Sequence, residues 1–172
     1  GLATQVPTTI RVALCRPKRP IEIKYVRYEF IELSKHRMFG YDETMEMGEK
    51  INVSDLERTV LDAIDRPGLV GGVEVSAQAV FHGGRKMSHR KILDYLRRFD
   101  DSALARRFGY LCEVLKVRLP EYLKRYLSGQ TKRIPAFLGS PGRWGREGEP
   151  DKRWSLIINV GRDELLGEVH IG

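Results

Sequence analysis

The chain has 172 residues, of which 41% are hydrophobic and 31% charged, enough apolar material for one compact domain or two small ones. This composition argues against bulk disorder, and no apolar run is long enough to cross a bilayer. The first residues lack the charged and apolar regions of a signal peptide, so we expect a cytoplasmic protein. Two cysteines, Cys15 and Cys112, are too few for a disulfide framework, and we expect both to be small core residues.

Positive charge is concentrated in one stretch of the chain. The formal net charge is +7. Residues 1–84 hold 11 Lys and Arg against 12 Asp and Glu, residues 85–153 hold 18 against 8, and residues 154–172 hold 1 against 3. A basic chain favours polyanionic partners, although net charge says nothing about the fold.

Alternating apolar residues predict strands in the first third of the chain. A strand over residues 10–14 ends at Pro17 and Pro20, because proline cannot donate to a sheet. Residues 21–25 alternate again, and residues 28–32 continue on a shifted phase, which indicates a turn or bulge near Val26 and Arg27. Residues 43–47 and 50–53, joined around Gly48, predict a hairpin.

The middle of the chain has helical periodicity. Ser54 and Glu57 form the pattern of a capping box, in which each side chain accepts from the other residue's backbone N–H. We expect that helix to run over residues 54–66 and to stop at Pro67. Further helices are predicted over residues 73–80, over residues 88–99, after a cap at residues 100–102, and from Pro120 to a C′ glycine at 129.

The end of the chain returns to strand patterns. Residues 134–138 are a short apolar run, residues 140–151 predict a loop, residues 154–160 alternate as a strand, and residues 165–171 suggest a last one. The fold class is therefore α+β, with N-terminal antiparallel strands, a central helical cluster and C-terminal strands. We expect a strand-rich part over residues 1–84 and a basic helical part over residues 85–172, with a single domain as the alternative.

The acidic helix has a chemical and a structural interpretation. Asp55, Glu57, Asp62 and Asp65 could hold a metal or perform acid–base work. However, acidic side chains in a first helical turn are favoured by the helix dipole, and Arg58 can pair with Asp62 four residues later. We therefore expect the segment to fix the helix start rather than to catalyse a reaction.

No other pattern indicates a metal, a cofactor or a nucleophile. The histidines at 36, 82, 89 and 170 lack metal-ligand spacing, and Cys112 and Ser102 lack an evident base. The pairs Gly71-Gly72 and Gly83-Gly84 lack phosphate-loop spacing and are expected in tight turns.

The basic stretch is the best candidate for a functional surface. Cations on helices neutralise phosphates without reading sequence. An acidic protein partner and an ordinary solvated helix face are the alternatives. The predicted phosphate contacts are Arg85, Lys86, Arg90, Lys91, Arg97, Arg98, Lys124, Arg125, Lys132 and Arg133, and the same stretch contains Arg106, Arg107 and Arg143.

One motif resembles a known family. Residues 53–67 contain Glu-Arg-Thr-x-x-Asp and then Asp-Arg-Pro, followed by a Gly-Gly pair. This pattern is similar to that of the AbiEi antitoxin family of type IV toxin–antitoxin systems. Its positions here are Ser54, Asp55, Glu57, Arg58, Thr59, Asp62, Asp65, Arg66, Pro67, Gly71 and Gly72. Weaker agreement extends, in the same order, over Gln5-Val6-Pro7, Phe39-Gly40, Phe108-Gly109-Tyr110-Leu111, Trp154 and Ile158-Asn159-Val160.

The resemblance implies an antitoxin and transcriptional autoregulator. In that family a winged helix precedes this region, and we expect it to be missing from this chain, which begins at Gly1. The implied partners are operator duplex DNA and a nucleotidyltransferase-like toxin, which the antitoxin need not bind directly. The expected protein is not an enzyme. The alternatives are a metal-dependent nucleic-acid-processing enzyme and a non-catalytic adaptor with a basic face.

Overall fold

The computed structural model describes residues 9–46 and 48–167, and the chain divides into two compact units, Gly1–Gly40 (unit 1) and Tyr41–Gly172 (unit 2). The predicted boundary at residues 84 and 85 falls inside unit 2. It is displaced because the helix expected over residues 54–66 packs on later helices. Gln5, Met47 and His170, and the end of the strand expected over residues 165–171, lie outside the described residues.

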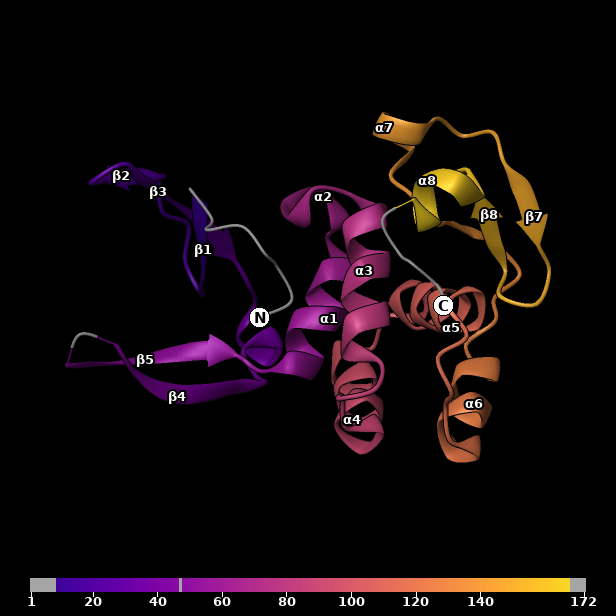
Figure 1. Ribbon diagram of the computed structural model, residues 1–172, viewed down its shortest axis with the longest axis horizontal. Helices are drawn as coiled ribbons and strands as arrows, with labels where there is room; N and C mark the ends of the chain where they lie inside the picture. The colour runs from indigo at the N-terminus through magenta and orange to yellow at the C-terminus, as the bar shows by residue number, and fades with distance from the viewer. Residues whose placement is uncertain (1–8, 47, 168–172) are drawn as a thin grey trace. The chain divides into compact units, whose positions relative to one another are not determined.

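Unit 1 contains a three-stranded sheet with the order β1-β3-β2, formed by β1 (Thr9–Leu14), β2 (Ile21–Ile23) and β3 (Val26–Glu32) (Figure 1). β2 and β3 are antiparallel as expected, whereas β1 and β3 are parallel. The turn lies at Lys24 and Tyr25, two residues before the predicted position. A short 3-10 helix, Lys35–Arg37, follows the sheet.

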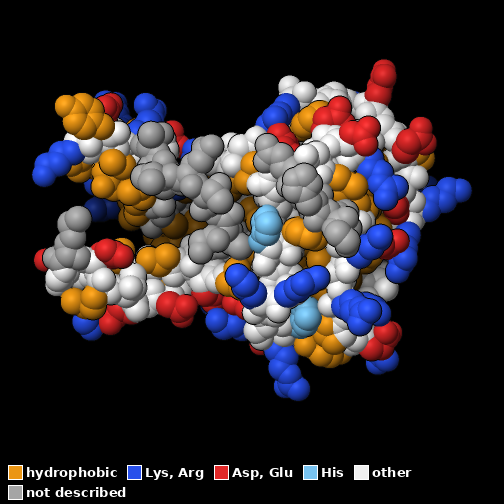
Figure 2. All heavy atoms as spheres, in the orientation of Figure 1, with side chains coloured by type: hydrophobic (Ala, Val, Ile, Leu, Met, Phe, Trp, Pro, Cys, Tyr) orange, Lys and Arg blue, Asp and Glu red, His pale blue; other side chains and the backbone are white. Residues whose placement is uncertain are grey.

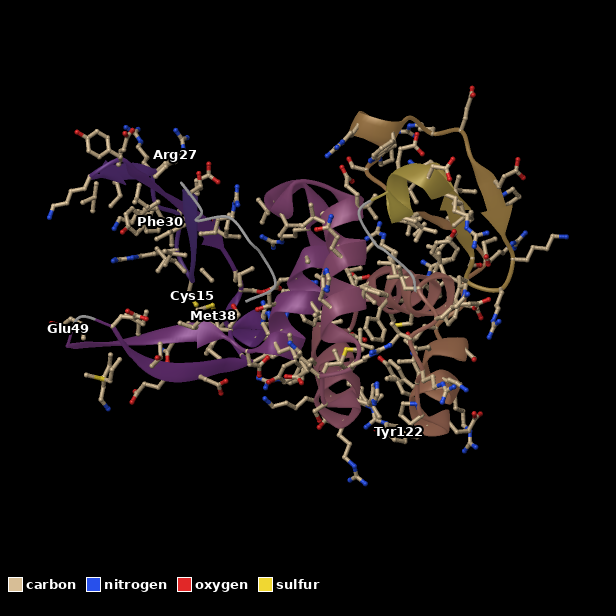
Figure 3. The ribbon with its side chains drawn as sticks, viewed as in Figure 1. Cys15, Arg27, Phe30, Met38, Glu49 and Tyr122 are labelled. Carbon is tan, nitrogen blue, oxygen red and sulfur yellow. The ribbon has the colours of Figure 1, made fainter. Side chains whose placement is uncertain are left out.

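The register of this sheet separates an apolar face from a polar one. Ile10 and Val12 pair with Tyr28 and Phe30, and Ile21 is on the other side of Tyr28. Because side chains alternate along a strand, Phe30 and Arg27 point to opposite faces (both are labelled in Figure 3). Cys15, expected in the core, is exposed at the end of β1 because the strand ends one residue earlier.

Unit 2 begins with an exposed hairpin and continues with helices. β4 (Tyr41–Glu46) and β5 (Glu49–Ser54) pair antiparallel, as predicted. The helices are α1 (Leu56–Asp65), α2 (Pro67–Val70), α3 (Val73–Gly83), α4 (His89–Phe99), α5 (Ser102–Val114) and α6 (Glu121–Ser128). Pro67 therefore ends α1 but also begins a short further turn, as its fixed φ favours.

The helical core follows the predicted periodicities. Leu104, Phe108, Leu111 and Leu115 of the α5 segment are all buried, and they are spaced as one helical face. Ile92 and Leu96 of α4 are buried, as are Leu123 and Leu127 of α6. α6 begins one residue later than expected, with Pro120 as its N-cap, and Gly129 has a right-handed φ instead of the predicted left-handed C′ conformation.

The last segment adds a second small sheet with the order β6-β8-β7. Its strands are β6 (Ala136–Phe137), β7 (Glu149–Asp151) and β8 (Leu156–Ile158), with α7 (Pro141–Trp144) between β6 and β7 and α8 (Arg162–Leu166) after β8. The predicted loop thus contains a helical turn and a strand, and α8 occupies the start of the strand expected from residue 165. The expected strand over residues 154–160 shrinks to three residues because Ser155 has a positive φ.

Two arginines attach this sheet to α5. The Arg106 guanidinium is buried and donates to the carbonyls of Ile134 and Ser155, at 3.3 and 2.8 Å. Arg107 Nε donates to the Phe137 carbonyl at 2.8 Å. Both belong to the basic stretch, yet they satisfy backbone carbonyls inside the protein. Among the described residues, no helix is long and apolar enough to cross a membrane.

Gly109 sets the distance between α5 and the second sheet. A Cβ at this position would overlap the ring of Trp154, which is buried and donates from Nε1 to Glu113 at 2.8 Å. We expect Gly109→Ala to destabilise the protein by about 1–3 kcal/mol through overpacking, although alanine is the better helix former. Thermal and urea unfolding measure this change.

Gly68→Ala is the matched control. Nothing lies within 4 Å of a Cβ at Gly68 in α2. Its unfolding free energy should stay the same or rise slightly. Equal effects of the two substitutions would contradict the close approach of Trp154 to α5.

Candidate nucleic-acid interface

Asp55 is a buried carboxylate that begins α1 and joins it to α4. Its Oδ1 accepts from the Arg58 backbone N–H at 2.8 Å, which makes Asp55 the N-cap. Its Oδ2 accepts from the Tyr95 hydroxyl at 2.6 Å and from Lys91 Nζ at 3.0 Å. One side chain therefore caps one helix and binds two residues of another.

The predicted capping box between Ser54 and Glu57 is wrong. Ser54 is the last residue of β5, and the cap is one residue later. Glu57 accepts from the Ser88 backbone N–H at 2.5 Å, immediately before α4, and lies 3.6 Å from Lys91 Nζ. That N–H is one of the donors at the start of α4 that have no partner within the helix, and Glu57 satisfies it. The Glu57 carboxylate is therefore bonded to the α4 segment and not to the start of its own helix.

Arg58 fills the space between α1 and α4. Its side chain is 2% exposed, and its Nε donates to Asp62 Oδ2 at 2.8 Å, so the predicted i,i+4 pair is confirmed. Its guanidinium lies 4.8 Å from the centre of the Phe99 ring, at the end of α4. Thr59 lies 3.5 Å from the Ser54 carbonyl, and Asp65 pairs with Arg66 at 3.5 Å.

The pKa shifts agree with this arrangement. Burial alone would raise the pKa of Asp55, but hydrogen bonds from Tyr95, the Arg58 amide and Lys91 outweigh it and lower the pKa. The hydrogen bond to Asp55 raises the pKa of Lys91 to about 12. Burial and the bond to Asp55 raise the pKa of Tyr95 to about 12. At neutral pH the three groups are therefore a carboxylate, an ammonium and a neutral phenol.

The Gly71-Gly72 pair makes the turn between α2 and α3. Both glycines have positive φ, 111° and 138°, where other residues are strained. Arg143 Nη1 donates to the Gly71 carbonyl at 2.5 Å, and its Nη2 pairs with Glu74 of α3. The expectation of a tight turn is confirmed here, whereas Gly83 ends α3 and Gly84 is its right-handed cap.

The acidic side chains of α1 are engaged by neighbouring cations. Asp55 binds Lys91, Asp62 binds Arg58 and Asp65 binds Arg66. Within residues 9–46 and 48–167, no three His, Cys, Asp or Glu side chains are grouped to hold a metal ion. Cys112 is buried in α5, and burial raises the pKa of its thiol, which disfavours the nucleophilic thiolate.

Several cations of the basic stretch have structural partners. Lys91 was predicted to contact phosphate, but its ammonium is held by Asp55 and Glu57. Arg106 and Arg107 bind backbone carbonyls, and Arg143 binds Gly71 and Glu74. The local excess of positive charge therefore overstates the charge that is free to meet a ligand.

Five exposed cations lie on two segments that meet near the turn between α3 and α4. Arg85 and Lys86 occupy the turn, and Arg90 lies in the first turn of α4. A Cβ on Gly84 would come within 2.9 Å of Val117, so the turn packs against the segment between α5 and α6. Both neighbours of Val117, Lys116 and Arg118, are exposed. We call Arg85, Lys86, Arg90, Lys116 and Arg118 the turn surface.

Sequence reasoning missed Lys116 and Arg118. They lie outside the predicted helices, and only the tertiary contact between Gly84 and Val117 places them beside Arg85. No local pattern could have found them. Figure 2 shows several Lys and Arg side chains close together over the helices of unit 2.

The other predicted contacts are distributed differently. Arg97 lies over the Tyr126 ring at 5.7 Å, which joins α4 to α6, where Lys124 and Arg125 are exposed next to Tyr122 (labelled in Figure 3). Arg98, seven residues after Lys91, is on the strip of α4 nearer Asp55.

Lys132 and Arg133 lie on another part of unit 2. Both are exposed on the segment after α6, and the Lys132 carbonyl accepts from Ser155 at 2.5 Å. This bond ties them to the turn before β8, not to α4.

Comparison of the chain with models of protein families, with curated proteins and with solved structures finds no significant match.

The Asp55 centre generates a pH prediction. Because the folded-state pKa of Asp55 is lowered, its stabilising contribution is present above the ordinary value of 3.8 and is lost as the pH falls through the folded value. Asp55→Asn keeps a capping oxygen but loses the ion pair, and should cost about 1.5–3 kcal/mol at pH 7. Urea unfolding between pH 3 and 7 should show a smaller acid-dependent loss in the variant than in the native chain.

Asp94→Asn, an exposed carboxylate on α4, should leave the pH profile unchanged. At high pH the raised pKa values of Lys91 and Tyr95 make stability depend on pH in the opposite direction. Their contribution is complete below about pH 10 and is lost as the pH rises towards about 12. An Asp55→Asn variant with the native acid profile would contradict a charged Asp55 in the fold.

Proposed function

We propose that the turn surface contacts the phosphates of nucleic acid. The observation that carries this proposal is that Arg85, Lys86, Arg90, Lys116 and Arg118 are exposed on two segments that meet at Gly84 and Val117, while none has an ion-pair partner among the described residues. Free cations release counterions when they meet phosphates, whereas an ammonium that already binds a carboxylate gains little. The ligand that we propose is duplex DNA.

We further propose that the chain is the antitoxin-side region of an AbiEi-type transcriptional autoregulator. The resemblance of residues 53–72 to that family's motif supports this assignment. In the parent protein an upstream winged helix would read the operator, and the turn surface would add contacts that hold the duplex without reading its sequence. The same region would oppose a nucleotidyltransferase-like toxin.

The proposed mechanism involves no covalent chemistry. The carboxylates that an enzyme of this chain would use are Asp55, Asp62 and Asp65, and each faces its own cation. Such pairs stabilise a helix and hold the carboxylates away from an attacking group or a metal. This supports a binding protein over the metal-dependent alternative.

The duplex-binding prediction compares two substitutions of equal charge. Arg85→Gln with Lys86→Gln should reduce the slope of log affinity against log salt by about 1–2, because each phosphate contact contributes ~0.9. Lys132→Gln with Arg133→Gln removes the same charge at the Ser155 side and should change the slope less. Fluorescence anisotropy at several salt concentrations measures both, on the chain's own promoter and on a scrambled duplex.

Equal affinity for the promoter and the scrambled duplex is expected, since phosphate contacts carry no sequence information. Equal losses in the two double variants would show that net charge alone drives binding, and would refute a localised turn surface. Absence of binding at low salt would refute the nucleic-acid role.

The antitoxin assignment has its own prediction. Co-expression of the parent protein should relieve growth arrest caused by a nucleotidyltransferase-like protein encoded beside it. Asp55→Ala should abolish the rescue by lowering stability by about 2–4 kcal/mol, from the lost cap and charged hydrogen bonds. Asp94→Asn should rescue as the native protein does. Failure of the native protein to rescue would reject the antitoxin role.

A further inference from the structure

α4 and the segment that leads into α6 lie side by side and run in the same direction. Before the two helices begin, Val117 packs against the turn that precedes α4, since a Cβ on Gly84 would come within 2.9 Å of it. Further along both segments, the Arg97 guanidinium lies 5.7 Å from the centre of the Tyr126 ring. These two contacts fix both ends of a shared face, so residues between them on the facing sides lie near one another.

Arg90 and Tyr122 lie in the middle of this face. Arg90 precedes Arg97 by seven residues, so both are on one strip of α4, and Tyr122 precedes Tyr126 by four, so both are on one strip of α6 (Tyr122 is labelled in Figure 3). Because Arg97 meets Tyr126, the two strips are turned towards each other. We call Arg90, Arg97, Arg118 and Tyr122 the α4–α6 face. It is continuous with the turn surface, which shares its Arg90 and Arg118.

Tyr122 is the exposed aromatic side chain of this face. It is 42% exposed, whereas Leu123 and Leu127 of the same helix are fully buried. Tyr126 is half-buried, and burial raises the pKa of its hydroxyl. α6 is therefore attached to the core through its leucines and Tyr126, and much of the Tyr122 ring is left open to a flat group from outside the protein.

The charges around Tyr122 do not cancel. Residues 85–100 and 116–125 together hold 10 Lys and Arg. The same ranges hold three carboxylates, those of Asp94, Asp100 and Glu121. The last of these pairs with Lys124 at 3.9 Å. Arg90 and Arg118 are exposed and have no ion-pair partner among the described residues, so the ring lies among cations that are free to bind an anion.

We propose that the α4–α6 face binds an unpaired nucleotide, whose base stacks on Tyr122 while Arg90 and Arg118 contact the neighbouring phosphates. A nucleotide combines a flat ring with a charged phosphate, and an exposed aromatic ring among free cations matches both. A base inside a duplex is already stacked on its neighbours, so only an unpaired base can offer its face to Tyr122. The inference rests on the proposed phosphate contacts of the turn surface and adds a single-stranded ligand to them.

The test removes the ring and keeps an apolar side chain. Tyr122→Leu should weaken binding of a fluorescent single-stranded oligodeoxynucleotide to the full chain about fivefold or more. The same strand annealed to its complement should keep its affinity within about twofold, because its bases are not free to stack. The unfolding temperature should stay near the native value, since Tyr122 is exposed and leucine is a good helix former.

Tyr122→Phe is the matched control, because it keeps the ring. Its affinity for both probes should stay within about twofold of native, since stacking uses the face of the ring. Native single-strand affinity in Tyr122→Leu would overturn the proposal. An equal loss on the single strand and the duplex would also overturn it, because a contact that the duplex makes equally well is not stacking on an unpaired base.

The proposed function is tested separately on the duplex. If Tyr122→Leu has no effect while Arg85→Gln with Lys86→Gln still weakens duplex binding, the turn surface stands and only the stacking contact fails. If neither variant changes the affinity for either probe, both proposals fail.

Discussion

The fold of unit 2 depends on one buried carboxylate. Asp55 has two oxygens, and each is directed to a different helix: one caps α1, and the other binds Lys91 and Tyr95 of α4. Glu57 adds a bond to the amide that precedes α4. Since a buried charge is tolerated only when it is fully paired, these bonds fix where α4 starts. Arg85, Lys86 and Arg90 of the turn surface lie immediately before and within that start, so their placement is a consequence of the acidic cap.

Helical periodicity was enough to predict the five longer helices, α1 and α3 to α6, because burial of a single face leaves a local trace in the sequence, whereas the short helices α2, α7 and α8 were not predicted. Leu104, Phe108 and Leu111 are an example. The cap was misassigned because Ser54 and Asp55 are both good N-caps, and the choice between them depends on Lys91 and Tyr95, some forty residues later. The parallel pairing of β1 with β3 was missed for a similar reason, as alternation does not encode strand direction.

The candidate site could be predicted only in part, because a cation's role depends on its partner. Lys91 and Arg90 are neighbours on α4 and look equivalent in sequence, yet Lys91 is held by two carboxylates while Arg90 has no ion-pair partner among the described residues. Arg106 and Arg107 serve backbone carbonyls of the second sheet. Conversely, Lys116 and Arg118 join the turn surface through a contact of Gly84 with Val117. A count of charged residues along the chain therefore does not show which cations already have a partner inside the protein.

The residues of the motif that resembles the AbiEi family make contacts that hold the fold together. Asp55 and Glu57 join two helices, Arg58 packs on Phe99, and Gly71 with Gly72 forms a turn that accepts Arg143. Side chains committed to such bonds cannot also bind a ligand without dismantling the fold. The proposed nucleic-acid contacts therefore lie outside the motif, on exposed cations without ion-pair partners among the described residues. Those cations lie in unit 2 on the segments that meet at Gly84 and Val117, and the motif itself does not mark them.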